Sequence, residues 1–343
     1  MKALVLEKYN HFEFKEVKKP VVTDDEVLVQ VKAVGICGSD VHGMDGSTGR
    51  RIPPIIMGHE ASGVICQVGK KVIDWQIGDR VTFDSTIYRL DDWYTRKGRY
   101  NLSDNRVVLG VSCEEYRRHG AFAEFVAVPK HILYRLPDQV SFPQAAMVEP
   151  VAVALHALSL AKPEVNDSVV VVGAGMIGLF VIQLLKVAGC GNIIAIDLDE
   201  GKLKLAAQLG ATHCFNSNIP RLNEEILNLT HGRGADKAFE AVGISETVQL
   251  AVASVRKGGG VTLLGNLSPE IKFPVQSVVT RQIKVQGSCA ICGEYPAVLD
   301  LIATGKINVD ALVSAEAPLS EGADWFRRLY HKEKGLVKVI LKP

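Results

Sequence analysis

The amino-acid sequence predicts an α/β protein in which a mostly β domain is combined with a doubly wound domain built on a parallel sheet. Three observations predict this class. The chain of 343 residues and 37.2 kDa is longer than one compact core usually holds. Its first part consists of short Val- and Ile-rich segments, and from about residue 150 strand-like and helix-like segments alternate.

The composition is typical of a globular protein, with 47% hydrophobic and 22% charged residues. The net charge is +1, from 39 basic and 38 acidic residues mixed along the chain, so no basic surface for nucleic acid or anionic membrane is expected. The opening "MKALVLEKYN" carries charges where a signal peptide needs apolar residues. Seven cysteines without a disulfide-framework spacing fit a reducing compartment. We therefore expect a cytoplasmic protein.

The segments of the first domain are punctuated by Gly, Pro and Asp, as in "EVLVQVKAVG" and "ASGVICQVG". This pattern is typical of short β-strands. The texture changes near Glu149, because "PVAVALHALSLA" carries apolar residues at helical spacing after a proline that suits a first helical turn. A helix is expected there.

The alternating part follows at once. The strand-like segments are "SVVVVG", "NIIAID", "ADKAFEAVG" and "GGVTLLG", and the helix-like segments include "GKLKLAAQLGA" and "SETVQLAVASV". Continuous apolar strands separated by helices predict a parallel sheet covered on both faces. The pattern loosens after about Gly287, and "GLVKVILKP" is expected to be a closing strand.

A G-x-G-x-x-G motif stands between the first strand of this region and its helix, at Gly173, Gly175 and Gly178. The first glycine makes the turn, the second lets the backbone approach a pyrophosphate, and the third lets the helix pack closely on the strand. Such glycines alone are weak evidence, since they also suit a tight turn without a ligand. Here strand, glycines, helix and second strand come in the right order, which favours a dinucleotide site.

Asp197 ends the second strand and would accept hydrogen bonds from the adenosine ribose. No Arg follows it directly, so NAD is favoured over NADP. Lys202 could reach the ribose, although a solvated lysine on a helix face is about as common. The predicted cofactor-binding residues are Gly173, Gly175, Met176, Ile177, Gly178, Asp197 and Lys202.

Two short segments carry residue types that bind metals. "VGICGSDVHG" contains Cys37, Ser39, Asp40 and His42, and "IMGHEASG" contains His59 and Glu60. A thiolate, an imidazole and a carboxylate are ligands of catalytic Zn²⁺. From spacing alone, two interpretations are about equally favoured. The residues form a metal site, or Cys37 is an ordinary core cysteine while His59 and Glu60 face solvent.

A resemblance decides between these alternatives. The segments "GICGSDVH", "GHEASG", "GDRV", "GAFAEF", "EPVAVALHA" and "GAGMIG", with the strand-end Asp197, run over nearly the whole chain. Together they resemble the zinc-dependent medium-chain dehydrogenases, and within them the polyol branch related to sorbitol (L-iditol) and galactitol-phosphate dehydrogenases. The resemblance implies a GroES-like catalytic domain from residues 1–150 and 288–343 and a Rossmann NAD-binding domain from residues 151–287.

For the site, the resemblance implies one catalytic Zn²⁺ per chain. Its ligands would be Cys37, His59 and Glu60, with Glu149 either a fourth ligand or bonded through the metal-bound water. Asp40 would orient the imidazole of His59. Ser39 and His42 would carry the substrate proton to solvent.

The implied reaction is hydride transfer from a secondary alcohol of a polyol or sugar derivative to NAD, giving a ketose or ketone, in a homodimer or homotetramer. Ala290 and Ile291 stand where sorbitol dehydrogenases have an Arg-Tyr pair, so sorbitol itself is disfavoured. L-Threonine 3-dehydrogenase shares the metal and NAD motifs and stays an alternative. A second alternative is a zinc-free quinone reductase or structural protein that binds nicotinamide cofactor.

Many family members also hold a structural zinc with four cysteines. Within "YRLDDWYTRKGRYNLSDNR" those places are taken by Arg89, Asp92, Thr95 and Ser103. We expect no metal there, and an exposed pair such as Arg89 with Asp92 cannot replace one. Burial of aromatic rings against the domain or a neighbouring subunit is the predicted replacement, and a mobile loop is the alternative; the rings are those of Trp93, Tyr94 and Tyr100.

Overall fold

The computed structural model describes all 343 residues, which form two compact units. Unit 1 comprises Met1–Glu149, Ile291–Gly305 and Val309–Pro343, and unit 2 comprises Pro150–Ala290 with Lys306–Asn308. Unit 1 is therefore built from both ends of the chain. No helix of the chain is long and apolar enough to cross a membrane.

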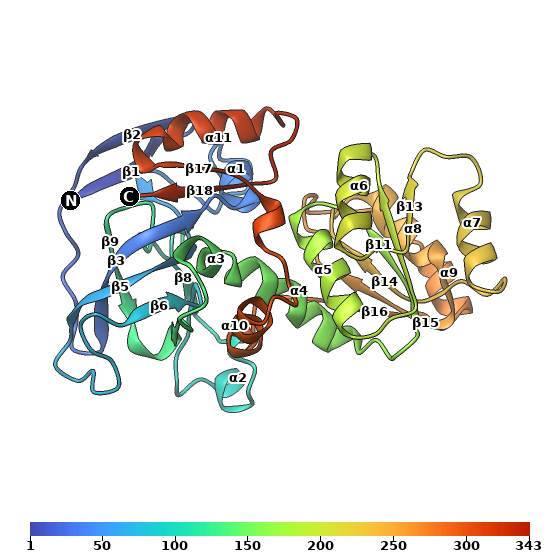
Figure 1. Ribbon diagram of the computed structural model, residues 1–343, viewed down its shortest axis with the longest axis horizontal. Helices are drawn as coiled ribbons and strands as arrows, with labels where there is room; N and C mark the ends of the chain where they lie inside the picture. Colours follow the sequence, from blue (N-terminus) through green and yellow to red (C-terminus); the bar gives the residue numbers. More distant parts are fainter. The chain divides into compact units, whose positions relative to one another are not determined.

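Unit 1 is mostly β (Figure 1). Its strands are β1 (Lys2–Lys8), β2 (His11–Glu16), β3 (Glu26–Gly35), β4 (Ile55–Ile56), β5 (Glu60–Val68), β6 (Arg80–Phe83), β7 (Thr86–Ile87), β8 (Val107–Val108), β9 (Phe125–Pro129), β10 (Leu133–Arg135), β17 (Val313–Pro318) and β18 (Lys338–Lys342). Its helices are α1 (Gly38–Gly43), α2 (Trp93–Arg96), α3 (Phe142–Ala146), α10 (Tyr295–Ala303) and α11 (Gly322–Tyr330), and α4 (Val148–Ala161) starts here and continues into unit 2.

The main sheet of unit 1 has seven strands in the order β10-β6-β5-β3-β18-β17, with β9 also paired to β3. The predicted closing strand is β18, which lies antiparallel to β3 with Ile340 opposite Gly35. On its other side β3 places Gly35 opposite Glu60, the first residue of β5. The C-terminal strand thus reaches the place where β3 ends and β5 begins.

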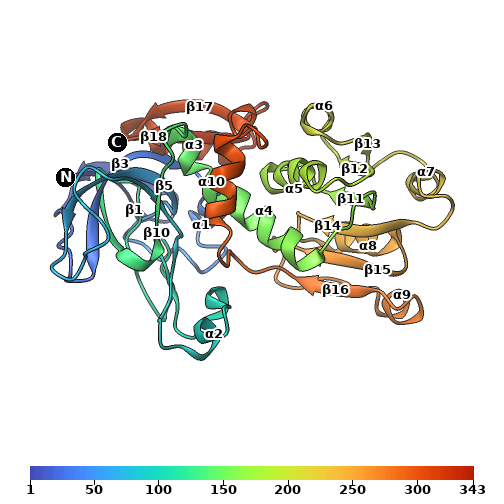
Figure 2. The same cartoon turned by 60° about the horizontal axis from the view of Figure 1, so that its bottom comes forward.

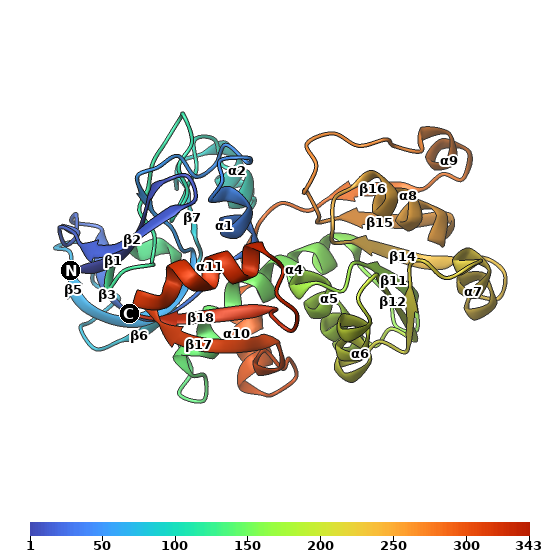
Figure 3. The ribbon, with the colours of Figure 1, turned by 90° about the horizontal axis from the view of Figure 1, so that it is seen from above.

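The core of unit 1 is apolar and includes Leu4, Leu6, Phe83, Phe122 and Phe326, each at most 1% exposed. Helix α11 contributes Phe326 and packs on β2 and α1 (Figure 3). Strand β3 is buried along most of its length, which indicates that both of its faces are covered.

Unit 2 is a doubly wound domain. Its six strands, all parallel, run in the order β13-β12-β11-β14-β15-β16, and α5 and α6 lie on one face with α8 on the other (Figure 2). The elements are β11 (Ser168–Val172), β12 (Asn192–Asp197), β13 (His213–Asn216), β14 (Ala235–Glu240), β15 (Val255–Leu263) and β16 (Lys284–Gly287), with α5 (Met176–Val187), α6 (Glu200–Leu209), α7 (Leu222–Leu229), α8 (Ser245–Ser254) and α9 (Val275–Thr280). The strand order reverses beside β11, which is where such folds bind ligands.

The segment 86–108, called the charged lobe below, is ordered by polar contacts. Strands β7 and β8 pair across its base, and α2 begins at Asp92, whose carboxylate accepts hydrogen bonds from the backbone N–H groups of Tyr94, Thr95 and Asp104. Asp92 is therefore a helix N-cap. Arg89 pairs with Asp91 at 2.9 Å, and both side chains are exposed, so this ion pair adds little to the stability of the lobe.

The aromatic rings of the charged lobe differ in burial. Tyr100 stacks on Tyr88 with ring centroids 4.3 Å apart, and its hydroxyl donates to Asp84 at 2.8 Å. Trp93 is 64% exposed and meets only the edge of Tyr94. Burial against the domain is therefore confirmed for Tyr100 and wrong for Trp93.

Candidate functional site

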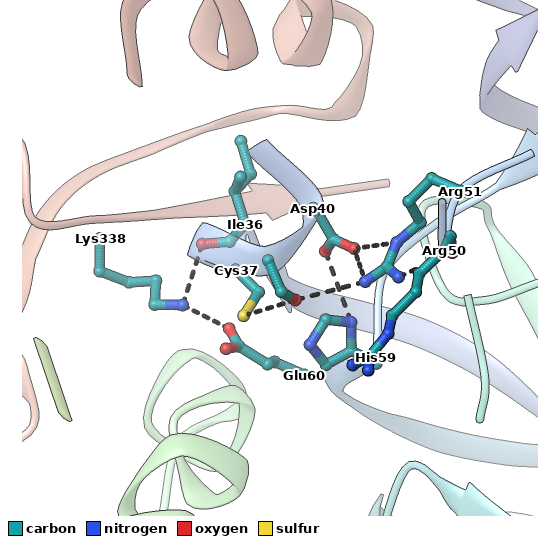
Figure 4. A network of polar contacts seen from close by, with 9 residues as sticks. Ile36, Cys37, Asp40, Arg50, Arg51, His59, Glu60 and Lys338 are labelled. Atoms are coloured by element: carbon teal, nitrogen blue, oxygen red, sulfur yellow. Dashed lines mark hydrogen bonds and ion pairs between the residues drawn. The ribbon is translucent and has the colours of Figure 1, made fainter. Parts of the chain in front are cut away.

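Three residues with metal-binding side chains come together in unit 1. Cys37 precedes α1, and His59 and Glu60 stand at the start of β5. Their ligand atoms all lie within 4.8 Å of one another, because Glu60 pairs with Gly35 and so brings the beginning of β5 to the loop that follows β3 (Figure 4). We call these residues the ligand cluster.

His59 and Glu60 of the ligand cluster are buried and Cys37 is partly exposed. Glu60 Oε1 makes no hydrogen bond, and His59 Nδ1 and Asp40 Oδ2 face only each other, at 3.5 Å. Such orphaned atoms are rare in folded proteins unless a ligand or ion satisfies them. A soft thiolate, an imidazole and a carboxylate are the donors that Zn²⁺ prefers, so the residues fit a zinc ion.

Asp40 lies behind the imidazole of His59. Its Oδ2 is 3.5 Å from His59 Nδ1, so the other ring nitrogen points toward Cys37 and Glu60 (Figure 4). Burial alone would lower the pKa of His59, but the negative charges of Asp40 and Cys37 outweigh it and hold the pKa well above its usual value. A metal would have to displace that proton.

Sequence reasoning missed Lys338, which completes the surroundings of Glu60. Its Nζ donates to the carbonyl of Ile36 at 2.9 Å and pairs with Glu60 Oε2, and both side chains are fully buried. Burial opposes the charged form of Lys338, but the Glu60 carboxylate more than offsets this and raises its pKa. A Cβ on Gly35 would lie 2.5 Å from Glu60 Oε2, so a glycine makes room for this ion pair.

Sequence reasoning also missed Arg51, which is 3% exposed. Its Nε and Nη2 donate to Asp40 Oδ1 at 2.9 and 2.7 Å. Burial alone would raise the pKa of Asp40, but His59 and Arg51 together lower it to about 2. Asp40 is therefore held as a carboxylate at the back of the ligand cluster.

Ser39 and His42 both lie on α1, but in different surroundings. Ser39 Oγ donates to Cys37 Sγ at 3.2 Å and accepts from Arg51 Nη2 at 3.3 Å. The His42 side chain is exposed in the last turn of the helix and makes no hydrogen bond to Ser39. The structure brings Ser39 to the ligand cluster and leaves His42 at the surface.

Glu149 lies in the first turn of α4 and outside the ligand cluster. Burial raises its pKa to about 8, and the negative charge of Glu60 adds to this while His59 opposes it. Burial and the charge of Glu60 thus both favour the neutral form of the Glu149 carboxyl group.

The glycine motif forms the expected turn in unit 2. Gly173 has a φ of +97°, and a Cβ on Gly178 would lie 1.9 Å from the Gly173 carbonyl oxygen, so both positions require glycine. A Cβ on Gly175 would meet open space. This is the place where a pyrophosphate would approach the N-terminus of α5, which begins at Met176 and Ile177.

Asp197 stands at the end of β12 next to this turn. Its Oδ2 accepts from Ala174 N at 2.7 Å and its Oδ1 accepts from Asp199 N at 3.0 Å. The carboxylate therefore ties the glycine turn to the second strand while staying partly exposed. Lys202 lies in the first turn of α6, where its backbone N–H donates to Asp199.

Comparison with known proteins identifies the family of the chain. Residues 23–138 match the model of the alcohol dehydrogenase GroES-like domain, and residues 177–304 match the model of the zinc-binding dehydrogenases. The chain is 32% identical over 347 residues to a sorbitol dehydrogenase of Bacillus subtilis, covering 100% of this chain and 97% of the relative. It is also 32% identical over 352 residues to a D-xylulose reductase of Saccharomyces cerevisiae, with 99% and 97% covered.

Solved structures are similar over the whole chain. Galactitol-1-phosphate dehydrogenase from Escherichia coli has a TM-score of 0.92 and 28% identity, with 100% of both chains covered. A zinc-binding dehydrogenase from Sinorhizobium meliloti bound to NADP has a TM-score of 0.92 and 30% identity, with 100% and 99% covered. This chain belongs to the family of zinc-binding alcohol dehydrogenases, whose members combine a GroES-like and a Rossmann-type domain. It is an oxidoreductase that uses zinc and a nicotinamide cofactor.

Proposed function

We propose that this protein oxidises a secondary alcohol of a polyol or sugar derivative and transfers the hydride to NAD. The observation that carries the proposal is the buried ligand cluster, in which Glu60 Oε1 has no partner. The similarity to a sorbitol dehydrogenase and a D-xylulose reductase supports a polyol as substrate.

In this proposal a zinc ion held by Cys37, His59 and Glu60 supplies Lewis acidity that makes a substrate hydroxyl easier to deprotonate. Glu149 is close enough to His59 and Glu60 to adjust the charge of the site. Asp40 keeps the His59 ring in place. These zinc-binding side chains would be the same for any bound alcohol. They therefore indicate the type of reaction but do not identify the substrate.

Ser39 Oγ accepts the substrate proton in our proposal, and His42 passes a proton on to solvent. The position of Ser39 next to Cys37 supports the first role, and the exposure of His42 at the end of the same helix supports the second. Removal of the Ser39 hydroxyl therefore interrupts proton transfer without removing a metal ligand.

The change Ser39→Ala tests this role. We expect turnover to fall by about 100-fold, the lower end of the usual contribution of a positioned acid–base group, while the zinc content stays that of the wild type. Turnover would be followed as NADH formation and zinc by elemental analysis. Equal turnover in wild type and variant would remove Ser39 from the proposal.

We favour NAD over NADP as cofactor because Asp197 would place a carboxylate beside a 2′-phosphate. The S. meliloti structure with NADP makes this preference worth measuring directly. Comparing kcat/KM for the two cofactors tests it, and a preference for NADP would overturn it.

The identity of the polyol is best approached with a panel. Ala290 and Ile291 stand where an Arg-Tyr pair would contact sorbitol, so we expect sorbitol to be a poor substrate. Sugar alcohols, alditol phosphates, inositols and L-threonine, each scored by NADH formation, would rank the candidates. We further propose a homo-oligomer in the cytoplasm, where the seven free cysteines would stay reduced.

A further inference from the structure

We propose that Arg51 is a positioning residue of the alcohol-oxidation site, which holds the Ser39 hydroxyl and the Asp40 carboxylate in their working orientations. The inference rests on the proposed role of Ser39 in proton transfer. Arg51 is not a metal ligand and lies in an irregular loop, eight positions before His59. Its role therefore could not be inferred from the spacing of the metal-binding residues.

All three nitrogens of the Arg51 guanidinium donate hydrogen bonds. Nε and Nη2 donate to Asp40 Oδ1, Nη2 also donates to Ser39 Oγ, and Nη1 donates to the carbonyl of Arg50 at 2.9 Å (Figure 4). A buried arginine keeps its charge, and its planar fork fixes its partners in direction as well as distance. Arg51 therefore joins the two side chains of α1 that serve the ligand cluster.

The contact to Ser39 restricts how its hydroxyl can be used. A serine hydroxyl has one donor and two acceptor positions. The donor points to Cys37 Sγ and one acceptor position is taken by Arg51. One acceptor position remains, where a substrate hydroxyl would donate its proton. As Ser39 Oγ accepts this proton, it releases its own proton to His42 and solvent, so the hydroxyl is regenerated. Arg51 keeps its protons throughout and so favours any negative charge that develops on Ser39 Oγ.

Two other segments of the chain hold Arg51 in place. Its backbone forms a bridge with Ser112, whose N–H donates to Arg50 O at 3.2 Å and whose hydroxyl donates to Ile52 O at 2.9 Å. On the other side a Cβ on Gly43 would lie 2.4 Å from Arg51 Cγ, so the glycine of α1 makes room for the arginine. A side chain supported in this way has little freedom to take another orientation.

The test compares Arg51→Ala with a matched control. We expect Arg51→Ala to lower kcat by about 10- to 100-fold, as expected for loss of a charged hydrogen bond, with KM changed by less than about threefold and full zinc content. Arg50→Ala removes the same charge from the neighbouring exposed residue and should keep kcat within about twofold. Added guanidinium chloride, at concentrations too low to unfold the protein, should restore part of the activity of Arg51→Ala and none of Ser39→Ala.

A second variant keeps the inference testable if Arg51→Ala does not fold. Gly43→Ala keeps the charge and displaces the Arg51 side chain, so we expect a lower kcat with full zinc content and no rescue by guanidinium.

If Ser39→Ala is impaired while Arg51→Ala and Gly43→Ala are not, the inference fails and the proposed function stands. If Ser39→Ala is unimpaired, the proton-transfer role fails first. If Arg51→Ala loses zinc in proportion to activity, or if Arg50→Ala is equally impaired, Arg51 has no specific positioning role.

Discussion

The ligand cluster and the charged lobe are two polar regions of the same unit, built in opposite ways. In the ligand cluster His59 Nδ1 and Glu60 Oε1 are buried without hydrogen-bond partners. In the charged lobe the Asp92 carboxylate accepts from three backbone N–H groups, and Thr95 Oγ1 is the lobe's one buried orphan. In the first region His59 Nδ1 faces Asp40 and Glu60 Oε1 is left for an ion to bind, whereas the second region satisfies its own backbone.

Two buried carboxyl groups show the same contrast. Asp40, with Arg51 and His59 beside it, has its pKa lowered to about 2 although burial alone would raise it. In Asp84, at the base of the charged lobe, burial wins and raises the pKa to about 6, because its partners Thr86 and Tyr100 are neutral donors. Asp40 thus has buried cationic partners, whereas Asp84 has only neutral ones.

The largest effect on stability is expected from Lys338→Met. It leaves Glu60 buried without its cation, which typically costs about 3 to 5 kcal/mol. Because bound zinc would itself compensate the Glu60 charge, the loss should be greater in zinc-free protein than in zinc-loaded protein. Chemical denaturation of both forms measures this, and equal losses would argue against Glu60 as a ligand.

Asp84→Asn tests the neutral surroundings of Asp84 at the base of the lobe. The folded pKa of Asp84 lies above that of the unfolded chain, so its contribution to stability is complete below about pH 3.8 and is lost as the pH rises through about 6, by about 1 to 3 kcal/mol. The variant lacks this titration. Unfolding free energies between pH 4 and 8 should therefore converge or cross as the pH rises, and a constant difference between the two proteins would contradict the assignment.

Asp92→Ala removes the carboxylate that caps α2 and bonds Asp104. We expect a melting temperature several degrees lower than that of the wild type, with unchanged zinc content and turnover. Asp91→Ala is the control, because Asp91 pairs only with the exposed Arg89. Loss of zinc in Asp92→Ala would mean that the two regions are not independent.

Trp93→Ala is expected to have the smallest effect. The ring is 64% exposed and contacts only Tyr94 in this chain, and exposed substitutions usually change stability by less than about 0.5 kcal/mol. Thermal melting and size-exclusion chromatography measure the outcome. A change of oligomeric state would show instead that a neighbouring subunit buries the ring, which is the other half of the sequence-based prediction.

The sequence predicted those features that depend on local order. The glycine turn lies between β11 and α5 as expected, since strand, turn and helix are adjacent in the chain. The closing strand at the C-terminus was predicted from its apolar pattern alone. The mixed class of fold follows from the same alternation of segments.

Long-range partners were not predictable. Lys338 is 278 residues from Glu60, and only the pairing of β18 with β3 brings it there. Arg51 looked like any loop arginine, because its burial depends on Gly43 and Ser112. The partner of Arg89 could not be chosen from sequence distance either, because Asp92 caps α2 and Asp91 pairs with the arginine.

The central claim is that the unit carries one open metal site, in the ligand cluster, and none in the charged lobe. Zinc analysis of the purified protein tests it most directly, with His59→Ala and Asp92→Ala measured in parallel. We predict one zinc per chain in wild type and Asp92→Ala, and none in His59→Ala. Two zinc ions per chain in the wild type, or zinc retained by His59→Ala and lost by Asp92→Ala, would contradict it.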